Sequence, residues 1–174
     1  VALGPSLRMS VGVYHGSILV SRFTGQAFHG DLDAYRHLVE EALAEAVGED
    51  RPYAHVTEWS AFKGGPHEVR KGLVLYLNAQ TNLRTYVNCN TSLLLRLSVN
   101  AAKRFYAVPF EVLFCDGMAN GITMAARRLG LTQMPDPVTV PDFLRPCAVP
   151  AQPFATQSPR FRPEWTVGDD ELTM

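Results

Sequence analysis

Two groups of polar residues in this sequence have the types and positions that could support binding or chemistry. The first follows the strand-like run 53–58 and leads into a helix predicted after Pro66; its members are Glu58, Trp59, Ser60, Lys63, Gly64 and His67. The second follows two later strand-like runs; its members are Asn88, Asn90, Thr91 and Asp116. In open α/β sheets, ligands bind outside the carboxyl ends of the strands. We therefore expect the first group to form an interaction or switch loop and the second to form a polar pocket.

Neither group contains a recognisable catalytic set. Cys89 and Cys115 have no obvious base beside them in the sequence, and a thiol becomes a good nucleophile only when its environment favours the thiolate. The chain has three cysteines, without the close spacing of a zinc knuckle or a redox dithiol. Its five histidines lack metal-ligand spacing, and only His55 and His67 could converge on the first group. We predict no catalytic residue, no metal and no cofactor.

The overall composition is that of an ordinary soluble protein. Apolar residues make up 47% of the chain and charged residues 19%. A formal net charge of −1 gives no electrostatic reason to bind nucleic acid, which attracts proteins through clustered Lys and Arg. No apolar run approaches the roughly 20 residues that cross a bilayer. We expect a cytoplasmic protein with reduced thiols, no nucleic-acid partner and no membrane insertion.

The polar groups are positioned by a predicted hairpin, a helix and three strand–helix units. The hairpin covers residues 11–24 around Gly16, and apolar residues at spacings of three and four predict a helix from Asp31 to Gly48. The later strands are predicted at 53–59, 83–89 and 110–115, and their helices at 66–79, 93–106 and 117–129. Repeated strand–helix units favour a largely parallel sheet with crossover helices. The strand at 53–58 is expected at its centre.

Three local signals refine these helices. Pro66 suits a first helical position, because its missing N–H would have no partner there. Gly72 weakens the helix around it, and we expect close packing against the sheet to compensate. Asn90, Thr91 and Ser92 supply capping side chains for the helix predicted at 93–106, and Asp116 is placed to cap the last helix.

The chain changes character after Leu131. Eight of its twelve prolines lie between Pro135 and Pro163, without a helical or strand period. Four aromatic residues punctuate this segment: Phe143, Phe154, Phe161 and Trp165. Aromatic side chains favour a tail held against its own domain or a second copy, whereas a plain linker would contain few of them. We divide the chain into an N-terminal lead (1–10), an α/β domain (11–132) and a Pro-rich extension (133–174).

The order of these elements resembles the STAS family (sulfate transporter and anti-sigma-factor antagonist domains). It is similar above all to the divergent STAS-like domains found beside histidine kinases and cyclases in bacterial signalling proteins. The resemblance covers residues 11–130 and is carried by three segments, YAHVTEWSAF at 53–62, KGLVLYL at 71–77 and FEVLFCDGMANGI at 110–122. It implies a mixed sheet of about five strands with crossover helices centred on Leu73, Leu97 and Ala125.

The resemblance also implies a function. It indicates a non-catalytic regulatory or sensory module that binds a protein such as a signalling kinase, a cyclase or another regulator, and that forms a homodimer with tail contacts. In the antagonist branch a serine at the start of the helix after the central strand is phosphorylated. This chain has no hydroxyl from Lys63 to Pro66, and only Ser60 lies near, so the sensory or dimerising branch is favoured. The alternative is a small-molecule-binding or enzymatic α/β domain that uses Asn88, Asn90 and Asp116.

Overall fold

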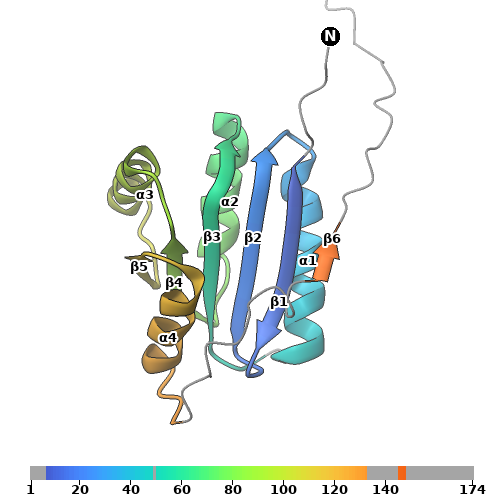
Figure 1. The fold of residues 1–174 in the computed structure, drawn as a ribbon, viewed down its shortest axis with the longest axis vertical. Helices are drawn as coiled ribbons and strands as arrows, with labels where there is room; N and C mark the ends of the chain where they lie inside the picture. The colour runs from blue at the N-terminus through green and yellow to red at the C-terminus, as the bar shows by residue number, and fades with distance from the viewer. Residues whose placement is uncertain (1–6, 49, 133–144, 148–174) are drawn as a thin grey trace, which may run out of the picture.

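The computed structural model describes residues 7–48, 50–132 and 145–147. Within these residues the chain forms one sheet in the order β5-β4-β3-β2-β1-β6, together with four helices (Figure 1). The strands are β1 Arg8–Tyr14, β2 Ile18–Gln26, β3 Tyr53–Gly64, β4 Leu83–Cys89, β5 Glu111–Cys115 and β6 Arg145–Cys147. The helices are α1 Asp31–Ala46, α2 His67–Asn78, α3 Leu93–Phe105 and α4 Met118–Arg128.

The sheet is mixed, as the sequence predicted. β1 and β2 form an antiparallel hairpin, whose turn places His15 and Gly16 at φ values of 49° and 62°. β2, β3, β4 and β5 are all parallel to one another, so the three strand–helix units share one sheet with the hairpin. The predicted α/β class is therefore confirmed, although the crossover helices between parallel strands are α1, α2 and α3, and α4 follows the edge strand β5.

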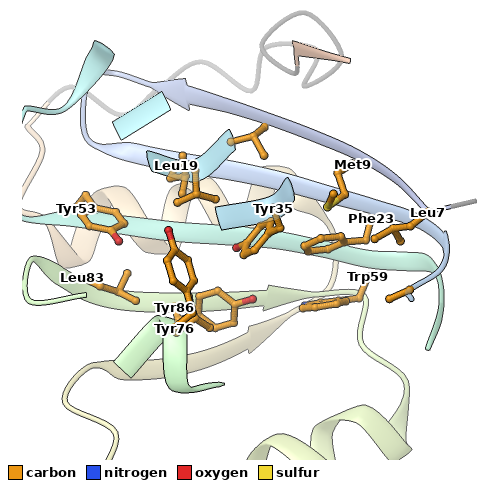
Figure 2. Close-up of a cluster of buried hydrophobic side chains, with 14 of the residues drawn as sticks. Leu7, Met9, Leu19, Phe23, Tyr35, Tyr53, Trp59, Tyr76, Leu83 and Tyr86 are labelled. Atoms are coloured by element: carbon orange, nitrogen blue, oxygen red, sulfur yellow. The ribbon is translucent and has the colours of Figure 1, made fainter. Parts of the chain in front are cut away.

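The helices form two layers around β3, which is buried continuously from Tyr53 to Trp59. α1 and α2 cover one face of the sheet, and α4 packs on the opposite face (Figure 1). Figure 2 shows the aromatic core under α1 and α2, in which the rings of Phe23 and Trp59 stack with centroids 5.0 Å apart. The α4 face instead uses small and aliphatic side chains, among them Val56 and Ala125. These small side chains leave room for α4 to pack closely against the sheet.

Several local predictions were wrong in detail. β3 continues to Gly64 and remains paired with β2, so residues 58–64 belong to a strand rather than a loop. Pro66 is the residue before α2 instead of its first helical residue. Gly72 faces Leu32 of α1, and a Cβ at that position would collide with the leucine side chain. The close packing at Gly72 is therefore between two helices, not between a helix and the sheet.

The ends of the domain also differ from the prediction. β1 begins at Arg8, and Leu7 and Met9 are buried, so the core includes part of the expected N-terminal lead. Arg145–Cys147 forms β6, antiparallel to β1, in a tail for which no strand was predicted. The four aromatic residues expected to hold the tail lie outside the described residues.

A polar group lies inside the aromatic core. His55 is fully buried in β3, and its Nε2 atom lies 2.9 Å from Ser21 Oγ and 3.4 Å from the Tyr35 hydroxyl. Burial disfavours the charged imidazolium and lowers the pKa of His55 to about 3. Between about pH 6.5 and pH 3 the folded protein therefore holds this ring neutral, whereas the histidine of an unfolded chain would take up a proton.

This burial makes stability depend on pH. The pKa of His55 is lower in the folded protein than in the unfolded chain. Its contribution to the free energy of unfolding is therefore complete above the unfolded pKa of 6.5 and declines as the pH falls towards 3. We expect the free energy of unfolding to fall by roughly 2 kcal/mol between about pH 7 and pH 5, measured by urea denaturation. His55→Gln should flatten this slope, whereas His37→Gln, at an exposed position of α1, should retain it. If the free energy of unfolding depended on pH equally in both variants, His55 would not be the source of that dependence.

Candidate functional site

Asn90 links the middle of β3 to the end of β4 and the start of α4. It follows β4 with a φ of 52°, a left-handed conformation that asparagine tolerates better than most residues. Its Nδ2 atom donates to both carboxylate oxygens of Glu58, at 3.1 and 2.9 Å, and its Oδ1 atom accepts a hydrogen bond from the Gly117 N–H at 2.9 Å. Its own N–H donates to the Cys115 carbonyl at 3.0 Å. One side chain thus joins β3, β4 and the start of α4.

The Glu58 carboxylate is almost completely buried but well provided with donors. Besides Asn90, the Ser60 N–H donates to its Oε1 atom at 2.9 Å. A buried carboxylate is tolerated only when hydrogen bonds replace its lost hydration. Glu58 is therefore held in place as a structural member of this cluster.

Arg96 attaches α3 to the same cluster. Its Nε atom donates to Thr91 Oγ1 at 3.0 Å, and its Nη2 atom donates to Asp116 Oδ1 at 3.3 Å. The Ser92 hydroxyl accepts from the Leu95 N–H and caps the helix, as the sequence predicted. Asp116 was expected to cap α4, but the residue preceding that helix is Gly117, and Asp116 binds Arg96 instead. The start of α3 is thus held by residues that leave β4 and β5.

The structure brings the predicted polar pocket together but fills it with internal partners. Asn90, Thr91 and Asp116 lie in the cluster, where each is hydrogen-bonded to a neighbour. Asn88 lies deeper, accepting from Trp59 Nε1 at 2.9 Å and donating to the Leu113 carbonyl at 3.4 Å. Asn88 also lines the cavity between the sheet, α2 and α3. That cavity is predominantly apolar.

The predicted switch group does not form one loop. Glu58 and Trp59 are buried in β3, whereas Ser60 and Lys63 are exposed near the carboxyl end of the same strand. Gly64 ends the strand with a φ of 104°, and its carbonyl accepts from the Ala27 N–H. His67 begins α2, while His55 lies in the core, so the two histidines do not converge.

Cys89 and Cys115 lie side by side, although their spacing in the sequence is not that of a redox dithiol. Their Sγ atoms are 3.3 Å apart and both are free thiols. Each is the last residue of its strand, and β4 and β5 are parallel with Cys89 opposite Cys115. The signal in the sequence was therefore their equivalent position in successive strands rather than their spacing.

The main cavity lies between the sheet, α2 and α3, and sequence reasoning missed it. It has a volume of about 420 Å³. Its floor is formed by aromatic side chains of the sheet, including Phe23, Trp59 and Tyr86. Leu73 of α2 and Leu95 of α3 are among its walls. A space of this size, lined mostly by apolar groups, suits a small organic molecule.

The α3 helix carries two apolar stripes and buries neither. The first lines the cavity with Leu95, Val99, Ala102 and Tyr106, spaced by three or four residues. The second is exposed and consists of Leu93 (74% exposed), Leu94 (75%), Leu97 (59%) and Phe105 (83%). In Figure 1 α3 stands beyond the carboxyl end of β4, away from the packed helices. No residue of α3 is buried, although the sequence predicted an ordinary crossover helix.

Basic residues surround the cavity. Arg70 and Lys71 of α2 and Lys103 of α3 are exposed at its edge, and none forms an ion pair with another described residue. Asp31 is the acidic residue that lines the same space, and its Oδ2 atom accepts from the Phe28 N–H. The rim is therefore electropositive and would favour an anionic group.

The described part of the chain contains no cluster of three or more side chains able to hold a metal ion. Nor does any helix in this part have the length and apolar character needed to cross a bilayer.

Comparison with known proteins supports the fold. No family model and no curated protein matches the sequence. Among solved structures, the chain is similar to an uncharacterized protein of the DUF3478 family with a SpoIIAA-like fold from Shewanella loihica PV-4. The TM-score is 0.54 at 17% identity, and the match covers 72% of this chain and 97% of the other. The fold is thus SpoIIAA-like, which confirms the STAS-like architecture.

The link made by Asn90 can be measured. Asn90→Gly preserves the left-handed backbone but removes the donors to Glu58, so we expect the free energy of unfolding to fall by about 1.5–3 kcal/mol in chemical denaturation. In Glu58→Gln the carboxylate is already absent, and Asn90→Gly should cost less in that background. Additive losses in this double-mutant cycle would show that the two side chains are not coupled.

Proposed function

Because the fold is SpoIIAA-like, we propose that this chain is a non-catalytic regulatory or sensory module of bacterial signal transduction. It acts in the cytoplasm through contacts with other proteins. The polar residues that follow β4 and β5 support this proposal, since Asn90 binds Glu58, and Thr91 and Asp116 bind Arg96, within the same domain. A catalytic site would instead direct such groups towards a substrate.

The main support for a protein-binding function is the exposed apolar stripe of α3. Its three leucines and Phe105 are more than half exposed, whereas α1, α2 and α4 each bury part of their apolar side. Scattered apolar residues are normal on a protein surface, but a contiguous apolar surface marks an interaction site. We assign the exposed stripe of α3 as the surface that binds the partner.

The charge of α3 indicates which kind of protein surface could bind it. Arg96, Lys103 and Arg104 are its charged residues, and its sequence contains no acidic residue. The surface therefore fits an apolar patch that carries carboxylates at its border. A second copy of this chain meets that description, because residues 133–174 contain six acidic and three basic residues together with aromatic ones. We propose a homodimer with tail contacts, in which a signalling kinase, a cyclase or another regulator can compete for α3.

Polar substitution on α3 tests this surface. Leu94→Gln with Leu97→Gln removes apolar groups that are already in water, so the fold should persist while the dimer dissociates to the monomer mass in light scattering. Leu75→Gln is the matched control, since this leucine is 48% exposed on α2 and should leave the dimer intact. A wild-type monomer, or a dimer insensitive to the α3 substitutions, would contradict the assignment.

A second function is favoured by a separate observation, the apolar cavity beside α3. A sensory module needs a ligand, and this space combines apolar walls with basic residues at its edge. It is suited to a molecule with a hydrocarbon chain and an anionic head, such as a fatty acid. The location differs from the polar pocket that the sequence suggested.

A dansylated fatty acid can probe the cavity. We expect saturable binding with enhanced dansyl fluorescence, and a rise in melting temperature because the probe binds the folded state. Ala102 lines the cavity, so Ala102→Trp should weaken binding at least about tenfold by filling it. Ala101→Trp, on the exposed side of the same helix, should bind as the wild type does. If both variants bound the fatty acid equally well, the probe would bind outside this cavity.

A further inference from the structure

Two thiols lie together at the carboxyl ends of β4 and β5. Cys89 and Cys115 are paired in the register of these strands, and their Sγ atoms are 3.3 Å apart. Both side chains pack on the face that α4 covers, where a Cβ at Gly121 would come within 2.5 Å of the Cys89 sulfur. We propose that Cys89 and Cys115 form a reversible redox site, in which a hydroperoxide converts the two thiols to a disulfide.

The pairing of β4 with β5 places the two cysteines directly opposite each other. Adjacent strands are about 4.8 Å apart, within the Cα separations of about 4.4–6.8 Å found in disulfides. The sulfurs need only approach from 3.3 Å to a bonding distance of about 2.05 Å. Rotation of the two side chains with a small strand movement is sufficient.

The two cysteines have different environments, which assigns each a role. Cys89 is buried, and its hydrogen bond to Cys115 together with burial raises its pKa. Cys115 is partly exposed, and the hydrogen bond from Cys89 lowers its pKa, with Arg96 acting in the same direction against burial, Asp116 and Glu58. Cys115 is the less buried of the two residues, so it is the one that a peroxide can reach first.

The reaction balances with one hydroperoxide. The Cys115 thiolate attacks a peroxide oxygen, the O–O bond breaks, and a sulfenic acid forms as hydroxide departs. The Cys89 sulfur then attacks Cys115 Sγ, the S–O bond breaks, and the released hydroxide leaves as water with the Cys89 proton. Two thiols are oxidised to one disulfide while hydrogen peroxide is reduced to two waters. A dithiol reductant reverses the change.

The redox site is directly connected to α3. Asn90 and Asp116 immediately follow the two cysteines, and Arg96 attaches α3 to Thr91 and Asp116. Drawing the two strand ends together must therefore shift the residues that hold the start of α3. The disulfide would regulate the exposed stripe of α3, and this second step rests on the proposed function. Formation of the disulfide itself does not depend on it.

Peptide mapping tests the site without any partner. The chain carries a third cysteine, so the experiment uses Cys147→Ser, whose backbone lies in β6 at the opposite edge of the sheet. Treatment with hydrogen peroxide should remove both titratable thiols and yield a Cys89–Cys115 crosslinked peptide, which dithiothreitol releases. Adding Cys115→Ser should abolish the crosslink. Sulfinic acid at Cys115 without a crosslink, or a link only between chains, would overturn the proposal.

Amide hydrogen exchange tests the connection to α3 separately. We expect exchange within residues 93–105 to differ between the oxidised and reduced forms of the Cys147→Ser protein, and the Cys115→Ser variant to show no such difference. Identical exchange in a protein proven to contain the disulfide would overturn the coupling to α3. Failure of the proposed function would appear differently, as an α3 surface that binds no partner in the reduced protein, while the crosslink still formed.

Discussion

The pairing of β3 with a strand on each side is the interaction on which the other features depend. Its register aligns Glu58 with Cys89, and the next register aligns Cys89 with Cys115. A slip of one residue would send every side chain of the strand to the other face of the sheet. A slip of β3 would therefore disrupt the aromatic core, the packing under α4 and the Glu58–Asn90 contact together.

The predictions from sequence succeeded where the signal is local. Alternating apolar residues located β4, and Ser92 correctly marked the start of α3. They failed where a distant partner decides the conformation. Residues 60–64 look like a loop because they lead into Gly64, Gly65 and Pro66, but they remain in β3 since β2 extends alongside them. Asp116 has the side chain of a helix cap, yet it binds Arg96 across 20 positions of sequence.

The candidate site was predictable only in part. The rule that parallel strands end at one edge correctly brought Asn90, Thr91 and Asp116 together. It could not show that Glu58 and Arg96 would be the hydrogen-bond partners of these side chains. The leucines of α3 indicated an apolar helix, but sequence periodicity cannot show whether a neighbour covers it. The cavity and the exposed stripe are both consequences of α3 standing away from the sheet, which is a property of the tertiary structure.

The short β6 strand has a consequence for the edge of the sheet. By pairing with Met9, Ser10 and Val11, it occupies hydrogen-bonding groups of β1 that would otherwise face other molecules. Unpaired edges recruit foreign strands and initiate aggregation. The opposite edge, β5, has five residues and carries an ion pair between Glu111 and Arg128, and short or charged edges discourage such recruitment. Three residues of the Pro-rich tail thus protect the hairpin from sheet-to-sheet polymerisation.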